Sequence, residues 1–375
     1  MTIESVRLHE LSLPLVHSFQ TSSHRKSHLT HILVELTDSD GRVGWGEIAS
    51  PSDPFYTSET ADIAWHISTE YLAPGLLGAD SSTPEALEST WARIRGHEFA
   101  KAGFSIAAWD LASRASETSL ATALGGVRTE VVAGVSLGIE PTVDELLEQV
   151  QHQLDAGYRR IKLKVAPGWD VEPVRAVRSA FGDIDLHVDA NGAYRDGSEA
   201  DTVFAALDAA KLTMIEQPFG VRNFTAHAAL QQRIDTPICL DESIVSIDDL
   251  HTMLTLDAGR VLNIKVSRMG GLSVAKQAHD VAFDAGVAVW CGGMHEFGIG
   301  RAANVALSAL PGFSLPSDVS GSDKYYAEDV IEPPVVAVDS VVAVPTGLGL
   351  GHEVRGDWIR EHASRMHETT KEAAL

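Results

Sequence analysis

The spacing of apolar and polar side chains divides the chain into two parts. Over residues 3–13 and 30–37 the two kinds alternate, which is typical of half-buried antiparallel strands. Helical patterns follow over residues 58–71, 84–95 and 101–114. We therefore expect residues 1–130 to form an α+β unit.

From about residue 131 short apolar runs alternate with amphipathic helical stretches, which is typical of parallel strands covered by helices. Eight runs are expected to be strands: residues 131–137, 160–165, 186–189, 214–216, 238–240, 262–265, 287–290 and 313–315. The simplest closure of eight such units is a (β/α)8 barrel over residues 131–319. A doubly wound open sheet is the alternative fold.

After Val319 this alternation lapses, and Pro333, Pro334 and Pro345 interrupt a Val-rich segment. We expect residues 320–375 to return as strands to the amino-terminal unit. The predicted fold is thus an α/β protein in which a (β/α)8 barrel carries an α+β capping domain built from both chain ends.

The composition limits the possible partners and the compartment. The chain has 29 Lys and Arg against 52 Asp and Glu, a formal net charge of −23, which repels nucleic acid and anionic membranes. Cys239 and Cys291 lie in apolar runs typical of buried, reduced thiols. No leader pattern begins the sequence, and no run approaches the roughly 18 apolar residues of a membrane span. We expect a cytoplasmic protein.

Five ionisable residues stand at the carboxyl ends of consecutive predicted strands, namely Lys164, Asp189, Glu216, Asp241 and Lys265. They are separated by 24 to 27 residues, about one strand and helix unit each. Active sites of (β/α)8 barrels lie at the face where the carboxyl ends of the strands converge. The spacing therefore predicts that these five side chains surround one barrel mouth.

The three carboxylates of this set suggest a metal site. Left unpaired at low dielectric, Asp189, Glu216 and Asp241 would repel one another, and oxygen ligands suit a hard cation such as Mg²⁺, or Mn²⁺. The alternative is that each one caps the helix that follows its strand. The flanking lysines favour the metal site over three separate caps.

Lys162 and Lys164 lie two residues apart and would share the interior face of a barrel strand. A neighbouring ammonium and a metal would both favour the neutral form of Lys164, which suits a general base. Lys162 would tune that base and contact the substrate. The alternative is an exposed edge strand with solvated lysines.

Lys265 would flank the carboxylates from the other side. Arg268 could lower the pKa of Lys265 and favour its action as a base, or could be a loop arginine in solvent. Asn191 could orient the substrate or a metal-bound water, or could form a turn before Gly192. Glu242 is given no primary role, and neither is Asn263, which we expect to point away from the face of Lys265.

The sequence around these residues resembles the enolase superfamily, specifically the muconate-lactonizing subgroup and within it the o-succinylbenzoate synthases and N-acylamino acid racemases. The resemblance covers essentially the whole chain. The matching pieces are Lys162-Leu163-Lys164, Asp189-Ala190-Asn191, Glu216-Gln217-Pro218, Asp241-Glu242-Ser243, Lys265, Gly292-Gly293-Met294 and Gly298-Ile299-Gly300-Arg301. Further matches lie at residues 13–19, 44–47 and 54–56, whose loops would cap the barrel mouth and select the substrate.

The resemblance implies a metal-dependent enzyme that removes a proton α to a carboxylate through an enediolate. In o-succinylbenzoate synthesis, a step toward menaquinone, Lys164 would remove the proton and later help a hydroxyl leave as water, while Lys265 lends its charge. In racemisation of N-acylamino acids or dipeptides, Lys164 and Lys265 would exchange protons on opposite faces. Arg268 resembles the racemase-capable members and keeps dual activity open. A muconate cycloisomerase and a non-catalytic carboxylate-binding barrel are the remaining alternatives.

The resemblance also implies a small-molecule carboxylate substrate. We further expect a homo-oligomer. The expected substrate contacts are Ser136, Lys162, Asn191, Arg268, Gly293 and Met294. Two departures bear on the substrate: His295 and Glu296 follow Met294, and the loop over residues 18–24 is unusually polar. Members similar to mandelate racemase keep a catalytic histidine at the position of His295, but Lys265 argues against that subgroup.

Overall fold

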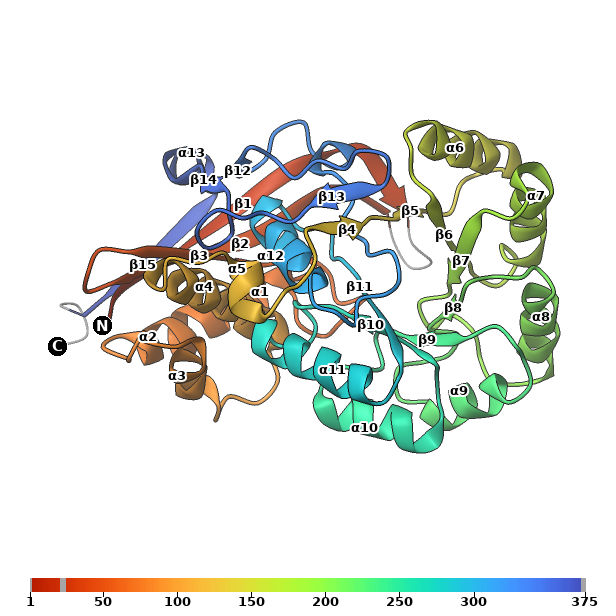
Figure 1. The fold of residues 1–375 in the computed structure, drawn as a ribbon, viewed down its shortest axis with the longest axis horizontal. Coiled ribbons are helices and arrows are strands. Elements are labelled where there is room, and N and C mark those ends of the chain that lie inside the picture. The colour runs from red at the N-terminus through yellow and green to blue at the C-terminus, as the bar shows by residue number, and fades with distance from the viewer. Residues whose placement is uncertain (1, 21–24, 372–375) are drawn as a thin grey trace.

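A computed structural model describes residues 2–20 and 25–371 of the chain. A four-stranded antiparallel sheet lies at one side of the molecule, with the strand order β15-β1-β2-β3 (Figure 1). These strands are β1 (Ile3–Gln20), β2 (Arg25–Asp38), β3 (Val43–Ile48) and β15 (Arg365–Thr370). β15 pairs with β1 from Ser5 opposite Thr370 to Glu10 opposite Arg365, so the last strand of the chain completes the first sheet.

Helices cover one face of this sheet. They are α1 (Ala61–Ile67), a π-helical turn (Ser68–Leu72), α2 (Ala73–Leu76), α3 (Pro84–Glu88), a 3-10 turn (Ser89–Trp91), α4 (Glu98–Ala115) and α5 (Leu120–Leu124). Glycines let α4 lie directly on β3, because a Cβ atom at Gly46 would be 1.9 Å from the carbonyl oxygen of Gly103. The amino-terminal unit is therefore α+β, as predicted.

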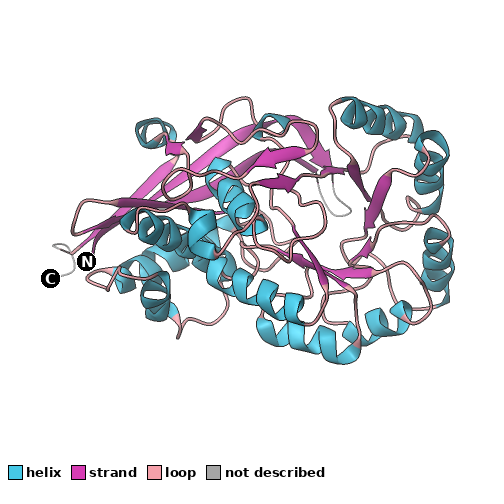
Figure 2. Ribbon diagram, in the orientation of Figure 1, coloured by secondary structure: helices cyan, strands magenta, loops and turns pink. Residues whose placement is uncertain are grey.

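The larger part of the molecule is a curled parallel sheet with the strand order β11-β10-β9-β8-β7-β6-β5. Its strands are β5 (Val135–Leu137), β6 (Arg160–Lys164), β7 (Asp185–Asp189), β8 (Ile215–Glu216), β9 (Ile238–Leu240), β10 (Val261–Ile264) and β11 (Ala288–Cys291). The strands follow chain order without a reversal, which rules out the doubly wound alternative. Figure 2 shows the helices arranged around the outside of these strands.

The outer helices are α6 (Val143–Asp155), α7 (Val171–Phe181), α8 (Ser198–Asp208), α9 (Phe224–Gln231), α10 (Ile247–Leu256), α11 (Leu272–Asp284) and α12 (Gly298–Ser308). Local signals start them. At α6 the Thr142 side chain caps the backbone N–H of Glu145, and Asp144 adds a favourable charge in the first turn.

In the part of the chain that the structure describes, no helix has the length and apolar character needed to cross a bilayer.

Two predicted barrel strands were wrong in detail. Residues 131–137 form two strands, because β4 (Glu130–Val132) pairs with β13 (Val341–Ala343) and only β5 enters the barrel sheet. Gly134 marks the break, where a Cβ atom would lie 1.9 Å from Nε of Arg160.

The expected eighth strand over residues 313–315 is an extended segment with isolated bridges. Phe313 bridges to Val289 of β11, and Ser317 bridges to Ala133 just before β5. Pro316 has no N–H to donate, which prevents a regular ladder in this segment. The bridges still connect the two edge strands of the curled sheet, so the ring follows the predicted barrel closely.

The chain after the barrel returns along the capping sheet. It forms a 3-10 turn (Ser322–Lys324), β12 (Ile331–Glu332), β14 (Glu353–Val354) and α13 (Gly356–His362) before β15. β12 pairs with β14, and β13 pairs with β4, which directly precedes β5 in the chain. The capping part thus contains segments from both chain ends, as the predicted fold requires.

Glu47 joins the capping sheet to the barrel. Its buried carboxylate accepts hydrogen bonds from the backbone N–H groups of Phe297 and Gly300, both at 2.7 Å, and lies 2.7 Å from Nδ1 of His31. Glu47→Ala leaves these buried partners unpaired and is expected to lower the free energy of unfolding by roughly 2–4 kcal/mol. Urea denaturation measures this change, and the exposed Glu361→Ala is the matched control.

Candidate active site

The barrel sheet brings the five strand-end residues together. Lys164, Asp189 and Glu216 are adjacent in the strand register, at the last positions of β6, β7 and β8. Asp241 and Lys265 follow the last residues of β9 and β10 directly. All five side chains are buried. Their common location is the carboxyl face of the sheet, as the spacing predicted.

The three carboxylates form a compact group at the centre of this site. Asp189, Glu216 and Asp241 each offer one oxygen, and these oxygens all lie within 4.8 Å of one another. Burial raises the pKa of Glu216, and the charge of Asp189 adds to this shift. The group consists of buried oxygen donors alone, which is the ligand chemistry that Mg²⁺ and Mn²⁺ prefer.

The two catalytic candidates stand at opposite ends of the carboxylate group. Nζ of Lys164 donates to Asp189 and, at 2.8 Å, to Oδ1 of Asn191. Nζ of Lys265 donates to Oδ2 of Asp241 at 2.8 Å and to the hydroxyl of Tyr56 at 3.2 Å. A substrate bound over the carboxylates would therefore have one ammonium group on each side.

Lys162 is buried inside the barrel, so the exposed edge strand is wrong as an alternative. Its Nζ donates to Asp318 at 2.7 Å and to Glu216 at 3.4 Å, and lies 4.7 Å from the ring centroid of Trp290. Burial alone would lower the pKa of Lys162, but the charges of Asp318 and Glu216 outweigh it and raise the pKa. Lys162 is therefore a fixed positive charge near Lys164.

Arg268 is also buried and belongs to the site, which excludes a solvated loop arginine. Its guanidinium pairs with Asp241 and donates to the carbonyl oxygens of Asn263 at 2.7 Å and Ile244 at 2.8 Å. The net shift of the Lys265 pKa is upward, and the expected lowering by Arg268 stays a prediction. Burial favours the neutral amine, but the acidic groups around Lys265 outweigh it and raise the pKa.

Asn191 has the predicted turn conformation, and its predicted contact with substrate or a metal-bound water stays a prediction. Its φ of 46° is the left-handed conformation expected of a turn-forming asparagine before Gly192. Its Nδ2 donates to Glu242 at 2.9 Å while its Oδ1 accepts from Lys164. The turn thus positions an amide beside Lys164.

Sequence reasoning was wrong about Asn263. The side chain enters the barrel, and its Nδ2 donates to Oε1 of Glu216 at 2.7 Å. Asn263 and Lys265 lie two residues apart, so the alternation of a strand places both on one face, and this signal was available in the sequence. Glu242 was given no role, but its carboxylate accepts the hydrogen bond from Asn191. The prediction failed because β9 ends at Leu240, so the strand alternation does not extend to Glu242.

Asp318 was missed altogether. It follows the irregular eighth segment and accepts hydrogen bonds from Arg160 and Lys162 at 2.7 Å and from the hydroxyl of Ser136 at 3.0 Å. Three cationic residues on one face of β6, at positions 160, 162 and 164, were a signal that a buried acidic partner was needed.

Asn263→Ala tests whether the hydrogen bond from Asn263 to Glu216 helps the three carboxylates to bind a metal. The change removes a hydrogen bond that orients Glu216, and such outer partners typically contribute 10- to 100-fold to metal affinity. We expect the Mg²⁺ dissociation constant to rise by roughly 10- to 100-fold. Calorimetric titration measures it, and an unchanged constant would show that Asn263 does not orient a metal ligand.

Five of the six substrate contacts expected from the sequence line one cavity, which we call the metal-side cavity. Its wall includes Tyr56, Ser136, Lys162, Lys164, Asn191, Lys265, Gly293, Met294, His295 and Asp318. Arg268 lies behind Asp241 and is outside this wall. Of the polar loop over residues 18–24, residues 21–24 lie outside the described part of the chain.

His295 is held in the wall of the metal-side cavity. Its φ is 61°, its ring stacks on Tyr325 with centroids 4.9 Å apart, and its carbonyl oxygen accepts a hydrogen bond from Tyr326. Burial lowers the pKa of His295 well below its usual range, and nearby cations including Lys26 and Lys324 add to the shift. The ring is therefore neutral near pH 7.

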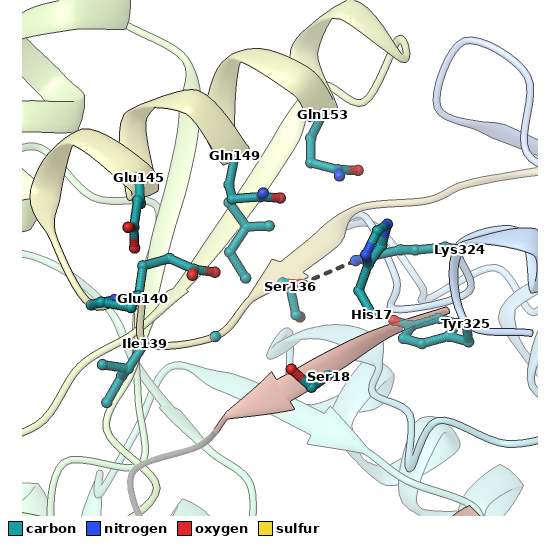
Figure 3. Close-up of a pocket in the computed structure, with 13 residues that line it drawn as sticks. His17, Ser18, Ser136, Ile139, Glu140, Glu145, Gln149, Gln153, Lys324 and Tyr325 are labelled. Atoms are coloured by element: carbon teal, nitrogen blue, oxygen red, sulfur yellow. Dashed lines mark hydrogen bonds between the residues drawn. The ribbon is translucent and has the colours of Figure 1, made fainter. Parts of the chain in front are cut away.

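A second cavity of 330 Å³, the side cavity, adjoins the first. Ser136 and Tyr325 line both. Figure 3 shows Glu145, Gln149 and Gln153 of α6 on one wall and Lys324 on the other, with its hydrogen bond to the carbonyl oxygen of Ser136.

Known proteins match both parts of the chain. Residues 3–125 match the mandelate racemase / muconate lactonizing enzyme N-terminal domain, and residues 145–358 match the enolase C-terminal domain-like family. An N-succinylamino acid racemase from Amycolatopsis is 46% identical over 94% of this chain and 95% of its own. An o-succinylbenzoate synthase from Geobacillus kaustophilus is 44% identical over 94% of each chain. A solved enolase superfamily structure from Listeria innocua superposes with a TM-score of 0.94 at 36% identity over 99% of each chain.

These matches confirm the resemblance identified in the sequence. They cover nearly the whole chain, and the similar relatives are a lyase and an isomerase. The chain is therefore an enzyme that belongs to the mandelate racemase and muconate lactonizing enzyme family of the enolase superfamily.

Proposed function

We propose that the enzyme removes a proton α to a carboxylate of a succinyl-bearing substrate, and that its main reaction is the dehydration that forms o-succinylbenzoate for menaquinone synthesis. The observation that carries this proposal is the row of three buried carboxylates with an ammonium group at each end. The names of the similar relatives support the succinyl group.

Asp189, Glu216 and Asp241 would hold the divalent metal, with Mg²⁺ proposed and Mn²⁺ as the alternative. When bound, the cation supplies positive charge that stabilises the anion formed on the substrate carboxylate as the α-proton leaves. Asn263 and Lys162 orient Glu216 from behind.

Lys164 is the proposed general base. Its Nζ takes the α-proton, and in the dehydration it returns a proton to the leaving hydroxyl, so that the C–O bond breaks and water departs. Lys265 stays protonated on the opposite side and stabilises the negative charge through its own charge. Asn191 holds Nζ of Lys164 in position.

Racemisation of N-succinylamino acids is the second candidate reaction. It requires Lys265 to exchange a proton on the face opposite Lys164. The observation in its favour is Arg268, whose buried guanidinium pairs with Asp241, the same carboxylate that Lys265 contacts. Arg268 binds Oδ1 of Asp241 while Lys265 binds Oδ2, so the two cations share one negative charge, which would weaken the hold of Asp241 on the lysine and favour proton transfer.

Two incubations separate these reactions. The Mg²⁺-loaded enzyme is given the cyclohexadiene precursor of o-succinylbenzoate, and separately each enantiomer of N-succinylphenylglycine in D₂O. Dehydration of the precursor supports the synthase, and exchange of the α-proton with loss of optical rotation supports the racemase. Exchange without dehydration would overturn the lyase proposal. A muconate cycloisomerase or a non-catalytic barrel predicts neither reaction.

The proposal includes a cytoplasmic location and a homo-oligomeric assembly. Light scattering during size-exclusion chromatography of the full chain measures the assembly, and a monomer at micromolar concentration would contradict that part of the proposal.

A further inference from the structure

The proposed substrates carry two carboxylates, and the metal group accounts for one of them. The second needs a cation that is free to bind it, because an unpaired charge in a half-closed cavity is costly. The cations that line the two cavities are Lys26, Lys162, Lys164, Lys265, Arg301 and Lys324.

Most of these cations already have partners. Lys162, Lys164 and Lys265 pair with the site carboxylates. The buried Arg301 donates to the carbonyl oxygens of Ser320 and Glu296, both at 2.8 Å. Within the described residues, Lys26, Arg301 and Lys324 form no ion pair, but the guanidinium of Arg301 is fixed by its two carbonyl partners and lies over the ring of Tyr325.

Lys324 has the position that a second carboxylate requires. Its Nζ donates to the carbonyl oxygen of Ser136 at 3.0 Å, and Ser136 lines the metal-side cavity as well as the side cavity. In the strand register Ser136 is opposite Lys162, one strand from the base Lys164. A substrate that extends from the carboxylate group past Ser136 would therefore bring its far end to Lys324.

The charges around Lys324 favour an anion. Burial lowers the pKa of Lys324 to about 7; Asp318 opposes this shift, and Arg160, Arg301 and Lys162 add to it. Arg160 and Lys162 both donate hydrogen bonds to Asp318, so the negative charge of Asp318 is already paired with other cations. A bound carboxylate would offset this excess of positive charge and favour the ammonium form of Lys324.

The wall of the side cavity opposite Lys324 carries acidic side chains. Glu140 and Glu145 line it there, together with Gln149 of α6 (Figure 3). The carboxylate of Glu145 repels an anion that enters deeply, which would keep the distal carboxylate at the Lys324 side, next to Ser136.

We propose that Lys324, at the junction of the two cavities, binds the second carboxylate of a dicarboxylate substrate and so determines the preference for succinyl-bearing compounds. This inference rests on the proposed function for the substrate class. It assigns Lys324 to substrate selection and leaves proton transfer to Lys164 and Lys265.

The test compares binding of two compounds to the Mg²⁺-loaded enzyme by calorimetry: o-succinylbenzoate, and o-butyrylbenzoate, which lacks the distal carboxylate. The wild type should prefer o-succinylbenzoate by about 10- to 100-fold, the typical contribution of a charge-assisted hydrogen bond. Lys324→Met should remove this preference and leave o-butyrylbenzoate binding within about twofold, and Lys324→Arg should retain most of it. Lys276→Met, on the outer helix α11 and remote from both cavities, is the control.

Three results would overturn the inference: equal binding of the two compounds by the wild type, a preference that survives Lys324→Met, or a preference lost only in Lys26→Met. Turnover of the cyclohexadiene precursor is measured separately. A protein that does not turn it over but keeps a Lys324-dependent preference would refute the proposed reaction and support the carboxylate site.

Discussion

Lys164→Ala is expected to lower kcat by roughly 10²- to 10⁴-fold, the usual contribution of a general base, while the protein stays folded. The change removes the amine that lies next to Asp189 and Asn191, and no other described amine contacts both. Asp189 keeps Lys162 at 3.9 Å and the backbone N–H of Asn191 at 2.9 Å. Its carboxylate therefore retains partners in the variant.

The measurement is steady-state turnover of the cyclohexadiene precursor, with thermal unfolding followed by circular dichroism as the check on folding. Lys276→Ala is the matched control, because Lys276 pairs with Asp280 on the outer surface of α11. Turnover of Lys164→Ala within a few fold of the wild type would show that Lys164 is not the base.

The second large effect is expected at the middle carboxylate. Glu216→Gln keeps the shape of the side chain but removes one negative charge and one strong oxygen donor from the group with Asp189 and Asp241. Its loss of metal affinity should exceed the roughly 10- to 100-fold typical of an outer residue such as Asn263. Turnover at low Mg²⁺ should fall with it.

Calorimetric titration of Mg²⁺ into the Glu216→Gln protein measures the metal affinity. Turnover measured over a range of Mg²⁺ concentrations shows how strongly activity depends on the metal. Partial recovery of turnover at high Mg²⁺ is the expected pattern. Equal Mg²⁺ affinity in the wild type and the variant would exclude Glu216 as a ligand.

Much of this site was predictable because a barrel repeats one unit. Each strand and helix unit returns the chain to the same face, so a spacing of 24 to 27 residues brought Lys164, Asp189, Glu216, Asp241 and Lys265 together in the structure. The same periodicity predicted the parallel sheet and its order.

The features that were missed depend on contacts that periodicity does not encode. Asp318 follows a segment whose bridges are isolated, so no strand pattern marked it as part of the barrel mouth. The pKa of Lys265 depends on the balance between its burial and the nearby acidic groups, including Tyr56 and Glu242, which only the folded arrangement reveals. Tyr56 lies in a loop that was expected to cap the mouth, but its hydrogen bonds with Asp241 and Lys265, far away in the sequence, were not predicted.

The central claim is that a metal held by Asp189, Glu216 and Asp241 and a base at Lys164 together remove an α-proton. The most direct measurement is loss of the α-proton signal of N-succinylphenylglycine in D₂O, followed by NMR, for enzyme stripped with EDTA and then resupplied with Mg²⁺. We predict no exchange without metal, recovery on addition of Mg²⁺, and no recovery in Lys164→Ala for the enantiomer whose proton faces that residue. Exchange that persists in the stripped enzyme, or that is undiminished for both enantiomers in Lys164→Ala, would contradict the account.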